Sequence, residues 1–327
     1  MLFVYFIALA AVICFAGIRL TNTVDKLSEE TGIGRGFLGV FLLALITSSP
    51  ELFATTTASV IGNTGLSLGN ILGSNVFNLT MLVWADLFLF EVALSRNVSV
   101  KSLANGLGSL LMLGLLGIAM SLAGMGIYLH LLGVPLMDWV LLAVYVLLLR
   151  NIWREEQNRP SDMAQAEDGV GRLWREVAVY SAMIIVSGIL ISIVCDKISH
   201  IQIKGVELGG TLVGSVLLGM ATSLPEMSVT ISAVRLGAVD MAIANVFGSN
   251  MFNEIIVFFA DLFGKRSILS ADYLQIFSLC TIGAMSAVFL LFSINKSQKR
   301  FLLVGLSSII IGFMYIIWLS VLYFARH

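Results

Sequence analysis

The stretch 47-TSSPELFATTTASVIGNTGLSLGNILGSNVFN-78 occurs a second time, 175 residues later, as 222-TSLPEMSVTISAVRLGAVDMAIANVFGSNMFN-253. The two copies align without a gap, and 13 of their 32 positions are identical. An apolar bias alone does not repeat Thr, Ser, Pro, Glu, Asn and Gly at the same places. The chain is therefore built from two related halves, and the repeated stretch is the place to look for its function.

The composition is that of an integral membrane protein. Of the 327 residues, 58% are hydrophobic and only 12% are charged, whereas a soluble domain has about 25% charged residues. A spanning helix needs about 20 apolar residues, and several long runs lack Asp, Glu, Lys and Arg. These runs are residues 1–18, 36–50, 52–85, 102–137 and 301–325.

Apolar runs separated by glycine-rich turns and charges predict ten spanning helices. Each half holds five, an odd number, so the second half crosses the membrane in the opposite sense. The expected fold is an all-α polytopic membrane protein of two inverted five-helix repeats, residues 1–150 and 176–327, joined by a polar linker at 151–175. The expected spans are 2–19, 34–60, 66–89, 103–123, 135–153, 176–195, 207–234, 240–262, 273–294 and 302–325.

The distribution of basic residues predicts the orientation. With the N-terminus outside, 14 of the 19 Lys and Arg residues fall in inward-facing connections, as the positive-inside rule requires. Both termini are then outside the plasma membrane, and the linker is in the cytoplasm. The first segment has no basic residue ahead of its apolar run and no clear cleavage pattern, so we expect it to be retained as a helix.

Several other features of the sequence narrow the function. The net charge is −1 and no basic block occurs, so nucleic acid is not an expected partner. The three cysteines, Cys14, Cys195 and Cys280, have no metal-ligand spacing, and we interpret them as packing residues. Asp138 follows Pro135, a typical first helical position, so we expect it at the surface in a first turn instead of as a buried charge.

Each copy of the repeat places a proline beside a glutamate inside an apolar helix. A proline cannot donate to the carbonyl four residues before it, so Pro50 frees the carbonyl of Ile46 and loosens that of Thr47. Pro225 does the same in the second copy. Bare carbonyls at membrane depth are tolerated only where protein, water or an ion satisfies them. The motif therefore supplies carbonyl and carboxylate oxygens at one depth.

Neutral oxygens accompany each glutamate. Thr47 and Ser48 precede Glu51 by four and three residues, which places all three on one helical face, and Thr222, Ser223 and Glu226 repeat this spacing. The next helix of each half has a stripe of polar residues at every fourth position: Asn70, Ser74 and Asn78 in the first copy, and Asn245, Ser249 and Asn253 in the second.

Two carboxylates with a set of neutral oxygens suit a hard cation such as calcium, which takes 6–8 oxygen ligands. The repeated stretches contain no imidazole or thiolate for a softer metal. Ser, Thr and Asn in membrane helices usually serve helix packing, and a lone proline is often only a kink. An intramembrane carboxylate is functional by default, and its appearance twice in the same context favours an ion site.

The motifs Pro50-Glu51 and Gly73-Ser74-Asn75, with their copies Pro225-Glu226 and Gly248-Ser249-Asn250, resemble the alpha repeats of the calcium/cation antiporter superfamily, in particular its prokaryotic sodium/calcium exchangers. The resemblance covers both halves. It implies a ten-helix protein of the prokaryotic inner membrane that works by alternating access, with helices 1 and 6 sliding across a fixed core. Calcium and sodium would be its substrates, with no cofactor and no enzymatic activity.

The same resemblance implies roles for individual residues. Glu51 and Glu226, with the carbonyls of Thr47 and Thr222, would bind calcium, and Asn78 and Asn253 would complete the centre. The implied sodium ligands are Ala44, Ser48, Ser74, Gly219, Ser223 and Ser249. Some prokaryotic members have an aspartate at the position of Asn253. Glu254 has Leu79 as its counterpart, and no role is implied for it.

The leading hypothesis is a secondary antiporter that exchanges calcium for sodium. Two glutamates carry a charge of −2, which one calcium or two sodium ions neutralise. An exchange of one load for the other therefore avoids leaving an empty charged site in a low dielectric. Two protons would neutralise it equally, so a proton/calcium antiporter is the nearest alternative. A passive cation channel is the alternative from another class.

Overall fold

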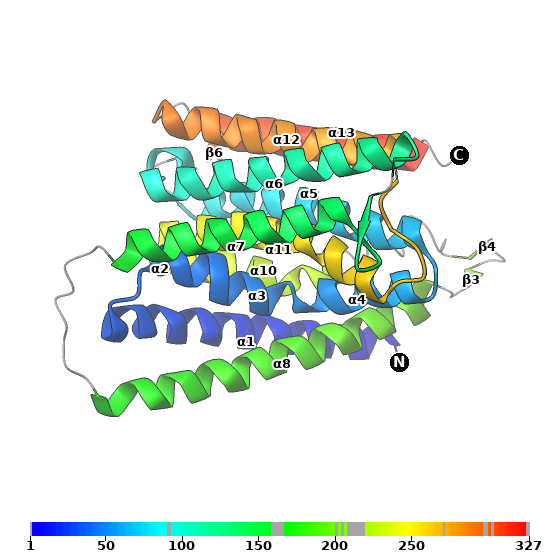
Figure 1. The fold of residues 1–327 in the computed structure, drawn as a ribbon. Coiled ribbons are helices and arrows are strands. Elements are labelled where there is room, and N and C mark those ends of the chain that lie inside the picture. Colours follow the sequence, from blue (N-terminus) through cyan, green and yellow to red (C-terminus); the bar gives the residue numbers. More distant parts are fainter. Residues whose placement is uncertain are drawn as a thin grey trace.

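Long helices make up nearly all of the computed structural model, which describes residues 2–89, 93–127, 129–157, 167–199, 202–203, 206–207, 220–270, 272–296, 300–301 and 304–324 (Figure 1). The first half contains α1 (Leu2–Thr31), α2 (Arg35–Phe37), the π-helix η1 (Leu38–Leu43), α3 (Ala44–Thr47), α4 (Ser49–Val60), α5 (Thr64–Phe88), the 3-10 helix η2 (Leu94–Arg96), α6 (Val100–Gly124) and α7 (Leu136–Gln157). The second contains α8 (Glu167–Ser199), α10 (Leu224–Arg235), α11 (Val239–Phe263), α12 (Tyr273–Ile294) and α13 (Leu306–Phe324).

The helices are long and apolar enough to make this a multi-pass membrane protein. Among the described residues, eight helices pass that test singly, and the pair Arg35–Thr47 and Ser49–Val60, bent by 46° at its break, passes it together and raises the count to nine if it is one span. The remaining expected span, 207–234, lies partly outside the described residues, and its second part is α10. Helices α7 and α8 extend from both sides into the segment expected as a linker, to Gln157 and from Glu167.

The two duplicated helices α5 and α11 run antiparallel through the middle of the bundle, as an inverted repeat requires. At the start of α11, Asp240 accepts hydrogen bonds from Ser102 Oγ at 2.6 Å and Ser99 N at 3.4 Å, just beyond the end of α5. At the other end of α11, Ser59 of α4 donates to the carbonyl of Ala260 at 2.7 Å. Most side chains of α11 are buried, which is typical of a helix that is apolar on all sides.

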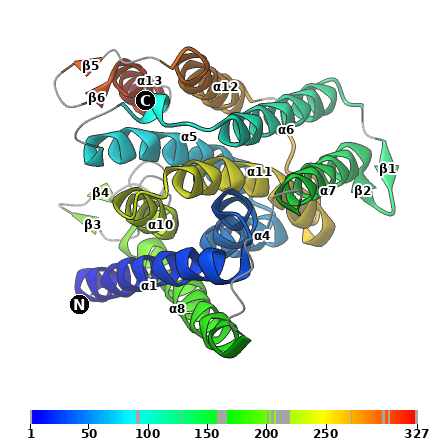
Figure 2. The same cartoon turned by 90° about the vertical axis from the view of Figure 1, so that its left-hand side faces the viewer.

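Helices α1 and α8 lie side by side on one face of the bundle, with α12 and α13 on the opposite face (Figures 1 and 2). Each of the first pair crosses the proline region of the opposite repeat at a glycine. A Cβ added at Gly17 of α1 would clash with Ser228 of α10. A Cβ added at Gly188 of α8 would lie 2.9 Å from the Cβ of Pro50. Glycine therefore allows these helices to pass directly over the two breaks.

Three antiparallel hairpins of two-residue strands add to the helices that the sequence predicts. They pair β1 (His130–Leu131) with β2 (Val134–Pro135), β3 (Gln202–Ile203) with β4 (Val206–Glu207), and β5 (Arg300–Phe301) with β6 (Val304–Gly305). The first hairpin leads into α7 and the third into α13. Strands this short leave the hydrophobic pattern of their flanking helices unchanged, which is why the sequence shows no sign of them.

The expectation for Asp138 is wrong in one respect. Asp138 does lie in the first turn of α7, but its side chain is fully buried instead of exposed. The reason is tertiary packing: α7 packs against α11 and against β2 at this end. A first turn faces solvent only where no other element covers it, and Pro135 carries no information about that cover.

Candidate functional site

The helix breaks fall at Ser48 and Ser223, which are equivalent positions in the two copies. Ser48 directly follows Thr47, whose carbonyl Pro50 was expected to loosen. Ser48 (φ −86°, ψ 6°) separates α3 from α4, and Ser223 (φ −90°, ψ 8°) precedes α10. Pro50 and Pro225 therefore occupy the first turn of a new helix, where a missing N–H removes no helical hydrogen bond. The proline interrupts the span completely instead of only kinking it.

Glu51 and Glu226 follow directly, in the first turns of α4 and α10. Both side chains are fully buried, and the two carboxylates are close enough to repel each other. The N-terminus of a helix carries a partial positive charge that attracts a nearby anion, and each glutamate lies at such an N-terminus. In the described part of the chain, no Lys or Arg forms an ion pair with either one.

The serines at the breaks bond across the repeats instead of along their own helices. Ser48 Oγ donates to Glu226 Oε1 at 2.8 Å, and Ser223 Oγ donates to Glu51 Oε1 at 3.0 Å. Thr222 also interacts with the Glu51 carboxylate, and Thr47 with that of Glu226. The spacing in the sequence predicts that these groups lie at one depth, but only the fold shows that they exchange partners between the halves.

Four asparagines connect α5 to α11. Asn78 Nδ2 donates to Asn250 Oδ1 at 3.0 Å, and Asn253 Nδ2 donates to Asn75 Oδ1, also at 3.0 Å. All four side chains are fully buried. These reciprocal bonds fix the amides so that the side-chain oxygens of Asn78 and Asn253 remain available to another partner.

Several buried oxygens of this centre have no hydrogen-bond partner within the described residues. They are Glu51 Oε2, Glu226 Oε2, Ser74 Oγ, Asn78 Oδ1 and Asn253 Oδ1. A buried polar atom without a partner normally costs about 1–3 kcal/mol, so five such oxygens on the contacting helices α4, α5, α10 and α11 indicate a bound group that satisfies them. Carboxylate, hydroxyl and amide oxygens together are the ligands of a hard cation.

The other predicted site residues that the structure describes lie in the same region. Thr47 Oγ1 is 3.5 Å from Ser249 Oγ, across the contact between α3 and α11. Ala44 is fully buried at the start of α3, and a Cβ added at Gly248 would lie 3.1 Å from its side chain. Gly219 lies outside the described residues, and Asn253 is one helical turn, about 6 Å, beyond Ser249.

Asn75 and Asn250 are candidate site residues, and although they belong to the repeated Gly-Ser-Asn motifs, their spacing alone predicts no role for them. Their signal was present, because Gly-Ser-Asn recurs at 73–75 and 248–250. Asn70 and Asn245, the first residues of the two polar stripes, bond threonines of the half-helices instead. They donate to Thr55 Oγ1 at 3.0 Å and to Thr230 Oγ1 at 3.1 Å. This matched pair of bonds holds the half-helices α4 and α10 against α5 and α11.

Glu254 directly follows Asn253 in α11, and its counterpart in the first repeat is Leu79, which is not an acid. Its side chain is fully buried, and neither carboxyl oxygen has a hydrogen-bond partner within the described ranges. Asp86 and Asp261 lie in the last turns of α5 and α11. Asp86 accepts from Leu94 N at 2.6 Å, and Asp261 accepts from Ile268 N at 2.7 Å.

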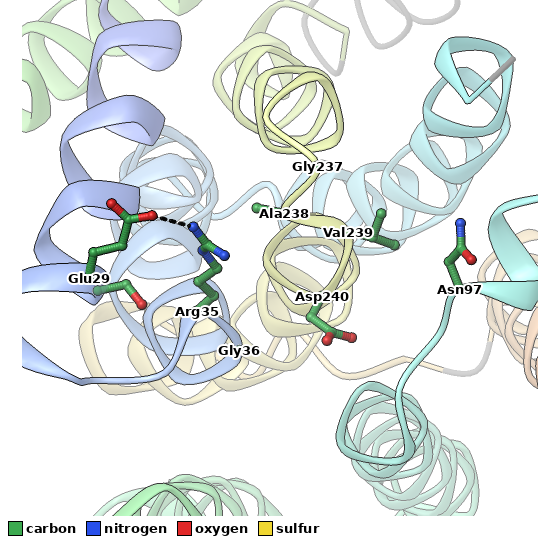
Figure 3. A pocket seen from close by; sticks show the side chains of 9 residues that line it. Glu29, Arg35, Gly36, Asn97, Gly237, Ala238, Val239 and Asp240 are labelled. Carbon is green, nitrogen blue, oxygen red and sulfur yellow. Dashed lines mark hydrogen bonds and ion pairs between the residues drawn. The ribbon is translucent and has the colours of Figure 1, made fainter. Parts of the chain in front are cut away.

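A pocket of about 510 Å³ opens at the end of the bundle where α11 begins. Figure 3 shows Glu29 and Arg35 on one wall, joined by an ion pair of 2.9 Å, with Asp240 and Asn97 on the other side. Ser249 lies nine residues further along α11 than Asp240, about 14 Å at the helical rise. The pocket shares no lining residue with the buried centre.

Comparisons with known proteins identify the family and the relatives of this chain. The family model for sodium/calcium exchanger proteins matches residues 1–149 and 177–324. Inner membrane protein YrbG of Escherichia coli (strain K12) is 25% identical over 95% of this chain and 93% of its own length. The putative antiporter CaxA of Alkalimonas amylolytica is 23% identical over 73% of each chain.

A solved structure of the sodium-calcium exchanger NCX_Mj superimposes on nearly the whole molecule. The TM-score is 0.75, the sequence identity is 19%, and the match covers 98% of this chain and 99% of the other. At this level of identity the likeness establishes a common fold.

Proposed function

The chain belongs to the sodium/calcium exchanger protein family, and on this premise we propose that it moves calcium and sodium in opposite directions through the centre built around Glu51 and Glu226. In this proposal the twelve residues named from the sequence serve as ligands or supply backbone carbonyls, and Asn75 and Asn250 hold the two site amides. Residues 1–150 and 176–327 act as the two inverted halves around that centre.

The observation that carries the proposal is the set of unpartnered oxygens around two buried carboxylates. Glu51 and Glu226 lie in a low dielectric with no ion-paired Lys or Arg among the described residues. Isolated buried charges are costly unless they are neutralised. Bound metal ions or protons must therefore supply the balancing charge, and the unpartnered oxygens on α5 and α11 favour metal ions because they can serve as ligands.

Coupling follows from the same charge balance. One calcium or two sodium ions neutralise the pair of glutamates, so the protein can change its conformation with either load, whereas the empty site would carry two uncompensated charges. Each half-helix pairs its glutamate with the serine of the opposite repeat. A movement of one repeat relative to the other therefore acts on both carboxylates together.

The proposed location is the prokaryotic inner membrane, with both termini outside. The relative YrbG is named as an inner membrane protein. Figure 1 supports the topology in part, because the two termini lie at one end of the bundle and the α1–α2 connection lies at the other. The pocket beside Arg35 is then on the cytoplasmic side.

A proton/calcium antiporter is the second candidate, since two protons also neutralise the pair. Calcium uptake into inverted vesicles, measured separately under a sodium gradient and under a pH gradient of equal size, distinguishes the two. We expect the sodium gradient to drive uptake and the pH gradient alone to leave it near background. Uptake driven only by the pH gradient would assign the protein to proton exchange, and calcium flux without any counter-ion would assign it to channels.

A further inference from the structure

A second group of buried carboxyls lies at the other end of α11, away from the pocket. The side chains of Asp138 in α7 and Asp261 in α11 interact directly. Asp138 is fully buried and Asp261 is 7% exposed. Within the described residues, neither carboxyl oxygen of Asp138 receives a hydrogen bond from an N–H or O–H donor. A buried, unpartnered side chain thus points at a second acid.

The equivalent place in the other repeat shows what is unusual here. Asp86 matches Asp261 at the shift of 175 residues, and it accepts hydrogen bonds from Gly305 N and from Ser308 Oγ, the latter at 2.7 Å, at the start of α13. Asp86, at the end of a central helix of the first repeat, is therefore satisfied by two neutral donors at or just before the start of α13, the last helix of the second repeat.

The hairpins that precede α7 and α13 have the same register, so Pro135 is the structural equivalent of Gly305, and Asp138 is the equivalent of Ser308. At the start of α7, the residues Pro135 and Asp138 therefore replace both of the hydrogen-bond donors that Asp86 has at the start of α13. Pro135 has no backbone N–H, and a carboxylate at 138 can only accept. Asp261 can therefore be reached from the start of α7 only if Asp138 carries a proton.

The remaining hydrogen bonds show which acid holds that proton. Asp261 accepts from Ser267 Oγ and from Ile268 N, the latter at 2.7 Å, as a carboxylate does. Asp138 has no comparable donor in the described structure, so it is the neutral acid whose O–H donates to Asp261. Two buried carboxyls in contact cannot both ionise, as in other acid pairs that share one proton.

Few other charged groups face this pair. His130 of β1 interacts electrostatically with Asp261, and Lys265 and Arg266 are exposed in the loop after α11. The other ionisable residues of α11 and of the neighbouring helices lie further from the pair. Glu254 is about two turns earlier in α11, Lys101 is at the opposite end of α6, and Arg35 of α2 is near the opposite end of α7.

We propose that Asp138 and Asp261 form a proton-binding site, in which one proton bridges the two carboxyl groups and joins the start of α7 to the end of α11. The ligand is a proton, and the site is separate from the Glu51–Glu226 centre. Loss of this proton at high pH replaces a hydrogen bond by a repulsion at one end of α11. The same helix carries Ser249 and Asn253 of the Glu51–Glu226 centre.

The expected consequence is a stability that falls as pH rises. The folded chain keeps a proton that an unfolded aspartate releases above about pH 4, so the folded state binds more protons and is destabilised by increasing pH. We expect the Tm of the purified protein in detergent to fall between pH 5 and pH 8 with a steeper slope than that of Asp138→Ser. The difference should be at least about 2 °C over this range.

Asp138→Ser reproduces the donor found at Ser308, and Asp138→Asn supplies an amide donor, so both variants keep a bond to Asp261 without a titrating group. Asp272→Asn, an exposed acid at the start of α12, is the matched control and should keep the wild-type slope. Infrared difference spectra of wild type against Asp138→Ser should show loss of one protonated carboxylic acid.

Equal pH slopes in the wild type and both Asp138 variants would overturn the proposal, as would an unchanged carboxylic acid signal. Loss of the wild-type pH slope of Tm when the same pH series is repeated with added sodium would assign the pair to a metal cation instead of a proton. These measurements do not involve transport, so they give their answer whether or not calcium exchange is found.

Discussion

Replacing Glu51 by Gln is expected to lower sodium-driven calcium uptake by about 100-fold or more. Removing one partner from a buried set of interacting charges costs about 3–5 kcal/mol, and each 1.4 kcal/mol corresponds to about tenfold in affinity. The substitution keeps the size of the side chain and its hydrogen bond from Ser223 Oγ, but it leaves the centre with one negative charge. The measurement is calcium uptake into inverted vesicles at equal protein levels.

The repeat makes Glu226→Gln a second test of the same claim. Because Ser48 bonds Glu226 as Ser223 bonds Glu51, both substitutions should cause losses of similar size. Glu29→Gln is the control, since Glu29 is an exposed acid paired with Arg35 at the pocket, and it should keep most of the activity. Full exchange by either centre variant would be incompatible with the proposed site.

Gly188→Val should slow exchange by about tenfold while leaving calcium binding nearly unchanged. Helix α8 passes over Pro50 at Gly188, where an added Cβ would lie 2.9 Å from the proline Cβ. Overpacking of this kind costs about 1–3 kcal/mol, and if α8 slides across the break during transport, the cost applies to the movement. The calcium ligands are on other helices, so equilibrium binding should be preserved.

Gly171→Val on the same helix is the matched control for that prediction, because nothing lies within 4 Å of a Cβ added at Gly171. Exchange rates and calcium affinities of the two variants are compared in the same detergent and vesicle preparations. Equal exchange rates in the two variants would show that α8 does not move across Pro50 during the transport cycle.

The sequence predicts much of this molecule because its information is duplicated. A shift of 175 residues identifies the paired prolines, glutamates, serines and asparagines, and the odd number of spans in each half predicts the inverted arrangement. The antiparallel α5 and α11 agree with it. The break at Ser48 also follows from local chemistry, since Pro50 cannot continue the preceding helix.

Contacts between the halves could not be predicted in the same way. The spacing in the chain places Ser48 beside Glu51, yet its hydroxyl bonds Glu226, 178 residues away. Asp138 was expected at the surface because Pro135 marks a first helical turn, and its partner Asp261, in another helix and another repeat, could not be identified from that turn. Periodicity and turn chemistry describe one element at a time, whereas burial and hydrogen-bond partners depend on which elements meet.

The most direct test of the central claim is a calorimetric titration of the purified chain with calcium, with and without sodium. The proposal predicts one calcium bound per chain, an apparent affinity that falls competitively as sodium increases, and no comparable binding to Glu51→Gln. Calcium binding that sodium does not displace, or that Glu51→Gln retains unchanged, would contradict a shared site at the paired glutamates.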